Sequence, residues 1–71
     1  MTNVELLKTE ISKSGLPISV LARKMGLSRE GLYLKLNGET EFKVSEIVKL
    51  SAALHLSHHK RDEIFFANEV N

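Results

Sequence analysis

Apolar side chains recur at helical spacing along most of the chain. Val4, Leu7 and Ile11 stand three and four residues apart, and Leu21 and Met25 follow the same spacing. Side chains at these intervals share one face of an α-helix, and no segment of strand length alternates between apolar and polar residues. The pattern predicts helices over residues 3–14, 18–25, 29–36, 45–55 and 58–67. We therefore expect one compact all-α domain, residues 1–71, built as a five-helix bundle.

Turn-forming residues separate the predicted helices. Pro17 suits the start of the second helix, where its missing N–H group has no intrahelical partner. Gly26 follows the last apolar residue of that helix, where a left-handed backbone is expected. Ser28 is an N-cap residue by type and begins the third helix. In the loop over residues 39–43, Phe42 is the expected anchor into the core.

The link between the second and third helices is short, with three or four residues around Gly26. Such a link sets two helices at a steep angle, as in a helix-turn-helix, whose second helix lies in the DNA major groove. Ala22 is small enough for the third helix to approach closely, and Leu32 anchors that helix in the core. The spacing of these residues predicts a DNA-binding domain, with the helix-turn-helix over about residues 18–36.

Three stretches of the chain resemble the lambda-repressor-like, Cro-type helix-turn-helix family: residues 16–30, Leu36-Asn37-Gly38 and Leu54-His55-Leu56-Ser57. The ending Ile64-Phe65-Phe66 is similar to small phage-encoded regulators. The resemblance implies a five-helix fold, sequence-specific binding of double-stranded DNA and regulation of phage or prophage transcription. It also implies a homodimer on a palindromic operator.

The resemblance implies that side chains at the start of the third helix read DNA bases. The positions that match are Ser28, Arg29 and Glu30, with Leu34 further along the same face. Arg29 can donate two hydrogen bonds to guanine O6 and N7, and Glu30 can accept one from cytosine N4. Leu34 can pack on a thymine methyl group, although an outward leucine can equally contact a protein.

Phosphate contacts are expected from residues that surround the third helix. The start of the second helix offers unpaired backbone N–H groups and a favourable dipole. Cationic and polar side chains on the second helix and around the end of the third helix complete the set. The predicted phosphate contacts are Ile18, Ser19, Arg23, Lys24, Tyr33, Lys35, Asn37, Thr40 and Lys43. Any one of these lysines can instead be an ordinary solvated charge.

The charge distribution favours the same half of the chain. Residues 1–36 carry six lysine or arginine residues against three glutamates, a net charge of +3. Residues 37–71 carry four against six acidic residues, a net charge of −2. Although the whole chain is only +1, a nucleic-acid surface is therefore expected in the first half.

Several classes of function are disfavoured by composition. The chain has no cysteine, which excludes a disulfide framework and a thiolate zinc site. The three histidines stand on both sides of a predicted helix break, so we expect solvated side chains and no metal site. No catalytic constellation or cofactor motif is present, and we expect neither enzymatic activity nor a small-molecule substrate. No apolar run is long enough for a membrane span, which makes the cytoplasm the expected compartment.

The last predicted helix supplies the candidates for a dimer interface: Ile64, Phe65, Phe66 and Val70. Adjacent aromatic residues on a helix point about 100° apart, so only one of Phe65 and Phe66 can face the core centre. Which one is buried stays open from the sequence.

Two alternative functions remain. One is a protein-interaction module of the same fold, similar to an antirepressor, in which Leu34 and the two adjacent phenylalanines contact protein. The other is an antitoxin, which the short stretch after Phe66 disfavours.

Overall fold

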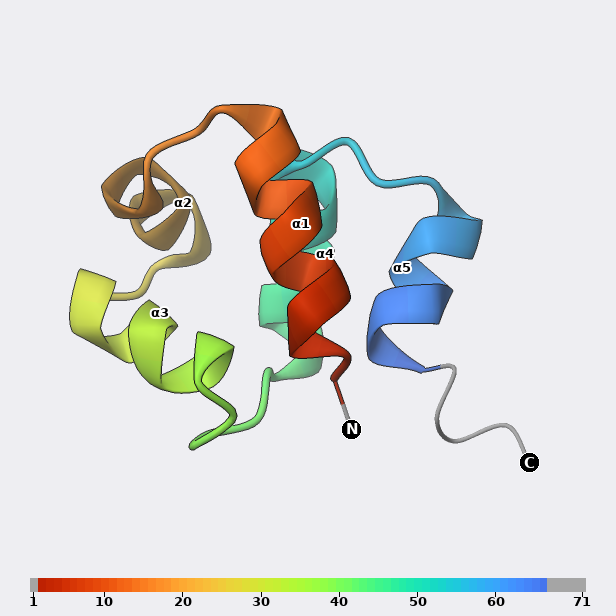
Figure 1. Ribbon diagram of the computed structural model, residues 1–71. Helices are drawn as coiled ribbons and strands as arrows, with labels where there is room; N and C mark the ends of the chain where they lie inside the picture. Colours follow the sequence, from red (N-terminus) through yellow and green to blue (C-terminus); the bar gives the residue numbers. More distant parts are fainter. Residues whose placement is uncertain (1, 67–71) are drawn as a thin grey trace.

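The computed structural model describes residues 2–66, and this part of the chain forms five α-helices and no strand. They are α1 (Val4–Ser14), α2 (Ile18–Met25), α3 (Arg29–Leu36), α4 (Val44–Ala53) and α5 (His58–Phe65) (Figure 1). The predicted all-α class is confirmed. No helix in the described part of the chain is long and apolar enough to cross a bilayer.

The side chain of the N-cap residue fixes the start of three helices. Asn3 accepts a hydrogen bond from the Leu6 amide at 3.1 Å, so α1 begins one residue later than predicted, at Val4. Ser28 caps α3 as predicted, and Ser57 caps α5 by accepting from the Lys60 amide at 3.0 Å. These caps pair backbone N–H groups that a helix leaves without an intrahelical partner.

The ends of α4 differ from the predicted range 45–55. The helix begins at Val44. It ends at Ala53, because His55 adopts a left-handed backbone with a φ of 54°. The Leu56 amide then donates to the Ser51 carbonyl at 2.9 Å, which closes the helix end. The helix α5 ends at Phe65, and the predicted end at residue 67 lies outside the described residues.

The core is formed by apolar side chains from every helix and from one loop residue. The helix α2 packs against α3 and α4, and α1 packs against α5. The Asn3 amide donates to the Ile64 carbonyl at 2.7 Å and ties the start of α1 to α5. The buried apolar residues are Leu7, Ile11, Leu21, Ala22, Met25, Leu32, Leu36, Phe42, Ile47, Leu50, Ile64 and Phe65.

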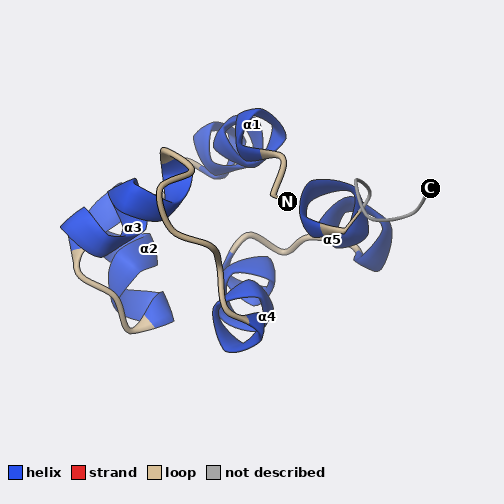
Figure 2. Ribbon diagram, turned by 90° about the horizontal axis from the view of Figure 1, so that it is seen from below, coloured by secondary structure: helices blue, strands red, loops and turns tan. Residues whose placement is uncertain are grey.

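Two aromatic rings connect the α3–α4 loop to α5. Phe42 and Phe65 meet edge to face, with ring centroids 5.6 Å apart. The prediction that Phe42 anchors the loop is therefore confirmed. Figure 2 shows α2 and α3 on one side of the molecule and α5 on the opposite side, with α1 and α4 between them. The candidate DNA-contacting helices and the candidate dimer helix thus lie at opposite ends.

Candidate nucleic-acid interface

The turn between α2 and α3 spans residues 26–28 and is satisfied by local hydrogen bonds. Gly26 ends α2 with a φ of 74°, in the left-handed region that disfavours side chains. The Leu27 amide donates to the Ala22 carbonyl at 2.8 Å, and the Ser28 hydroxyl accepts from the Gly31 amide at 2.9 Å. The axes of α2 and α3 run in clearly different directions (Figure 1). The turn therefore fixes the direction in which α3 leaves α2.

The helix α3 has a buried side and an exposed side. Leu32, Lys35 and Leu36 are buried against the rest of the molecule. All the predicted base-reading residues are exposed, including Leu34, which keeps 38% of its surface accessible. They are Ser28, Arg29, Glu30 and Leu34. Within the described residues Arg29 and Glu30 make no ion pair, so their charged groups are available to a ligand.

The start of α2 leaves backbone donors available. Pro17 precedes the helix and provides no side-chain cap. Its carbonyl accepts from the Val20 and Leu21 amides, at 3.0 and 3.1 Å. Within residues 2–66 the amides of Ile18 and Ser19 have no hydrogen-bond partner, whereas the Ile18 side chain packs against the core. The start of α2 thus has the donors that the sequence analysis assigned to phosphate.

Most of the other predicted phosphate contacts are on the surface. Arg23 and Lys24 are exposed on α2, and Tyr33 is exposed on α3. The residues after α3 follow the same pattern, with Asn37, Thr40 and Lys43 exposed. No ion pair involves Arg23, Lys24 or Lys43 in the part of the chain that the structure describes. These side chains are not committed to ion pairs within residues 2–66, but Lys24 lines a hollow with residues of α4 and not of α3.

Lys35 is the exception, and its predicted phosphate role is wrong. Only 8% of the residue is exposed, and its ammonium lies 3.1 Å from the Glu46 carboxylate. The ammonium also donates to the Glu41 carbonyl at 2.8 Å and lies 5.8 Å from the centre of the Phe42 ring. These contacts occupy the charge of Lys35 inside the protein. The residue therefore joins α3 to α4 and to the loop between them.

Glu46 completes this internal pair. Burial raises the pKa of its carboxyl, but the hydrogen bond from the Lys43 amide, together with the hydrogen bond and charge of Lys35, outweighs burial. The pKa of Glu46 therefore lies below its ordinary value. The Lys43 amide donates to the carboxylate at 2.8 Å. Glu46 is thus held ionised as the partner of Lys35 and as a cap at the start of α4.

Not all of the residues predicted for a dimer interface are accessible in the structure. Ile64 and Phe65 are core residues with 1% and 3% of their surface exposed, so they are not available to a second subunit. Phe66 is only half-buried, which answers the open question of which phenylalanine faces the core. Val70 lies outside the described residues. Of the four predicted residues, Phe66 is the described one with accessible apolar surface.

Two features escaped the sequence analysis. Lys8 on α1 lines a hollow with Tyr33 and Asn37 of the α3 region. The sequence does indicate where Lys8 lies on α1. Lys8 directly follows the buried Leu7 and so borders the buried face of the helix. The other feature is on α4, where Val44 and Val48 keep 74% and 61% of their surface exposed one helical turn apart.

Comparison with protein-family models, curated proteins and solved structures finds no match to this chain. The described residues contain no group of three histidine, cysteine, aspartate or glutamate side chains that could hold a metal ion.

Proposed function

We propose that this protein binds double-stranded DNA in a sequence-specific manner through the exposed side of α3. In this proposal α2 and α3 form a helix-turn-helix of the lambda-repressor-like, Cro type. The protein would act as a transcriptional regulator of phage or prophage genes in the cytoplasm. The observation that carries the proposal is the exposed row of Arg29, Glu30, Tyr33 and Leu34 next to the uncapped start of α2.

The exposed row combines the chemistry needed for reading bases. Arg29 offers a bidentate donor for guanine, and Glu30 offers an acceptor for the amino group of cytosine. Leu34 lies one turn beyond Glu30 and offers an apolar contact for a thymine methyl group. The charges of Arg29 and Glu30 are not neutralised by ion pairs within residues 2–66, so these two side chains can contact bases without breaking an internal ion pair.

Residues around α3 supply the contacts that set its position on the duplex. Phosphate on the α2 side would be contacted by the Ile18 and Ser19 amides, Arg23 and Lys24. Phosphate on the other side would be contacted by Tyr33, Asn37, Thr40 and Lys43. Phosphate contacts provide affinity and register but no direct sequence information. Because the chain carries a net charge of only +1, we expect two copies to bind a palindromic site together. Of the four predicted dimer-interface residues, Phe66 is the described one with surface available to such a pair.

The proposal is tested by titrating the protein with a random-sequence duplex pool at about 50 mM and about 200 mM salt and sequencing the bound fraction. We expect a palindromic motif whose half-sites lie about 10 base pairs apart, and affinity that falls steeply with salt. Binding that depends on salt without an enriched motif would leave a non-specific DNA-binding protein. No binding even at the lower salt concentration would overturn the proposal.

The protein-interaction module is the second candidate, and one observation favours it. Val44 and Val48 expose two large apolar side chains on the same face of α4. Exposed apolar patches often mark contacts with other proteins. Substituting both valines with serine separates the candidates, because DNA binding through α3 would be retained and binding of a protein partner through α4 would be lost.

A further inference from the structure

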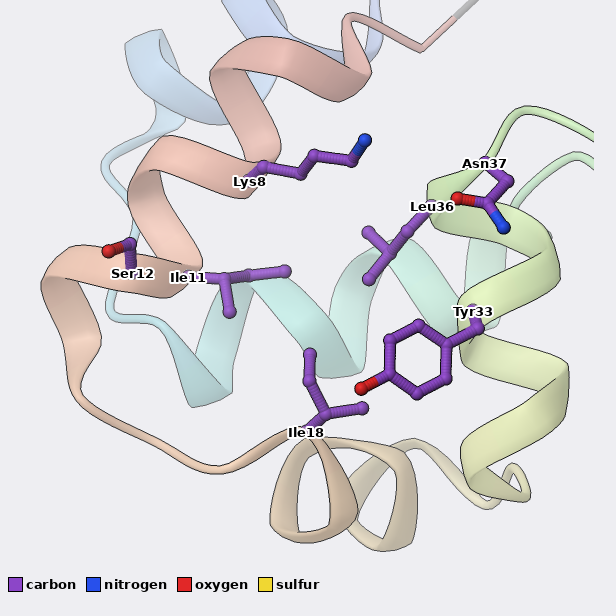
Figure 3. Close-up of a pocket in the computed structure, with 7 residues that line it drawn as sticks. All are labelled: Lys8, Ile11, Ser12, Ile18, Tyr33, Leu36 and Asn37. Carbon is purple, nitrogen blue, oxygen red and sulfur yellow. The ribbon is translucent and has the colours of Figure 1, made fainter.

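A hollow of about 360 Å³ lies beside the exposed face of α3 (Figure 3). It is an open depression bordered by α1, the start of α2 and the end of α3. Ile11, Ile18 and Leu36 form its apolar floor. Figure 3 shows Lys8 extending from α1 toward the end of α3, while the Tyr33 ring extends from α3 toward Ile18. Three helices that are separated in sequence thus contribute to one concave surface.

The hollow is continuous with the candidate interface. Ile18, Tyr33 and Asn37 line it, and each of them is also a proposed phosphate contact. A duplex positioned by the exposed side of α3 would bring its sugar–phosphate backbone to the two ends of that helix. The hollow therefore lies where a DNA strand next to the contacted groove would pass.

Lys8 brings a positive charge to the rim of this hollow. Its only ion pair among the described residues is to Glu5, whose carboxylate lies 3.9 Å away. Both side chains are largely accessible, at 47% and 86%, and an exposed pair of this kind contributes little to stability. The Lys8 ammonium can therefore exchange this contact for a phosphate at small cost.

The polar groups at the rim of the hollow favour an anionic ligand. Lys8 supplies an ammonium, Tyr33 a phenol hydroxyl and Asn37 a side-chain amide. All three can donate hydrogen bonds to a phosphate oxygen, whereas no carboxylate lines the hollow within the described residues. The apolar floor suits the carbon edge of a deoxyribose. An apolar side chain from a protein partner would use the floor but not the charge of Lys8.

We propose that this hollow binds one deoxyribose–phosphate unit of the duplex, with Lys8 and Asn37 at the phosphate and with Ile18 and the Tyr33 ring against the sugar. This inference rests on the proposed function, because the occupant is the backbone of the DNA that α3 contacts. It assigns α1 a role in DNA binding that the helix-turn-helix segment alone does not provide.

The test compares Lys8→Gln with Lys13→Gln on a single duplex over a series of salt concentrations. Lys13 is a matched control, because it lies on the same helix, pairs with Glu10 at 3.5 Å and does not line the hollow. We expect Lys8→Gln to weaken binding about fivefold to tenfold at 0.1 M salt and to lower the salt slope by about 1. Lys13→Gln should change neither quantity, and Lys8→Arg should keep the wild-type slope.

The outcomes separate the inference from the proposed function. If the wild-type protein binds DNA and Lys8→Gln matches both the wild type and Lys13→Gln, the inference is overturned and the proposed function stands. If no protein in the series binds duplex DNA at low salt, both are overturned. Thermal unfolding of each variant checks that the exposed substitutions leave the fold intact.

Discussion

The two sides of α3 carry similar side chains in opposite environments. Leu32 is fully buried, whereas Leu34 keeps 38% of its surface exposed two residues further on. Lys35 is buried and paired with Glu46, whereas Arg29 is exposed and makes no ion pair among the described residues. One leucine and one cation therefore stabilise the fold, and the other leucine and cation are available for binding. Residue type alone does not identify a functional residue on this helix.

The two leucines allow the largest expected contrast. Leu32→Ala removes a fully buried side chain from the core and should lower the free energy of unfolding by about 3–5 kcal/mol. Leu34→Ala should lower it by no more than about 1 kcal/mol, because more than a third of this residue is exposed. Chemical denaturation of both variants measures the difference. Similar losses for the two variants would show that α3 is not oriented as described.

The two cations give the next contrast. Lys35→Met leaves Glu46 buried with the Lys43 amide as its remaining hydrogen-bond donor and should cost about 2–3 kcal/mol of stability. Arg29→Met should cost less than about 0.5 kcal/mol.

The double variant Lys35→Met with Glu46→Gln tests the cause of that loss. It removes both charges and should recover a large part of the stability, because no unpaired charge is then buried. Equilibrium unfolding of the two single variants and the double variant gives the coupling between the residues. Strictly additive losses would contradict the buried ion pair.

A change of pH is expected to have a smaller effect on the free energy of unfolding. The pKa of Glu46 is lower in the folded protein than its ordinary value, which is about 4.3 in unfolded chains. The carboxylate therefore stabilises the fold above that pH, and this contribution is lost as the pH falls through the lower folded pKa. Between pH 6 and pH 3 the wild type should lose more stability than Glu46→Gln, in which this group cannot titrate. Parallel stability curves for the two proteins would contradict the lowered pKa.

Local signals in the sequence predicted most of the fold. Gly26 and Ser28 set the turn between α2 and α3 through contacts within a few residues, so their roles can be read from residue type and spacing. The end of α4 was missed because a histidine, at position 55, adopts the left-handed conformation that glycine usually provides. The exposure of the predicted base-reading residues also follows from helical periodicity, since Leu32 and Leu36 define the buried side.

The features that the sequence did not reveal depend on contacts between distant segments. Lys35 was expected at the surface, because its partner Glu46 approaches only after the loop between α3 and α4 folds back. Phe65, and not Phe66, is buried in the core because α5 packs against Phe42 and α1. The role proposed for Lys8 likewise requires α1 and α3 to border the same hollow.

The central claim is that the exposed side of α3 reads bases, and the most direct test compares Arg29→Ala with Arg23→Ala in selection from a random duplex pool. Both arginines are exposed, but only Arg29 is proposed to reach base edges. We predict that Arg29→Ala loses the preference at one base-pair position of the motif, a change of about 1–3 kcal/mol. Arg23→Ala should keep the motif and bind every sequence more weakly by a similar factor. If Arg29→Ala selects the same motif as the wild type with the same preference at every position, the exposed side of α3 does not read DNA.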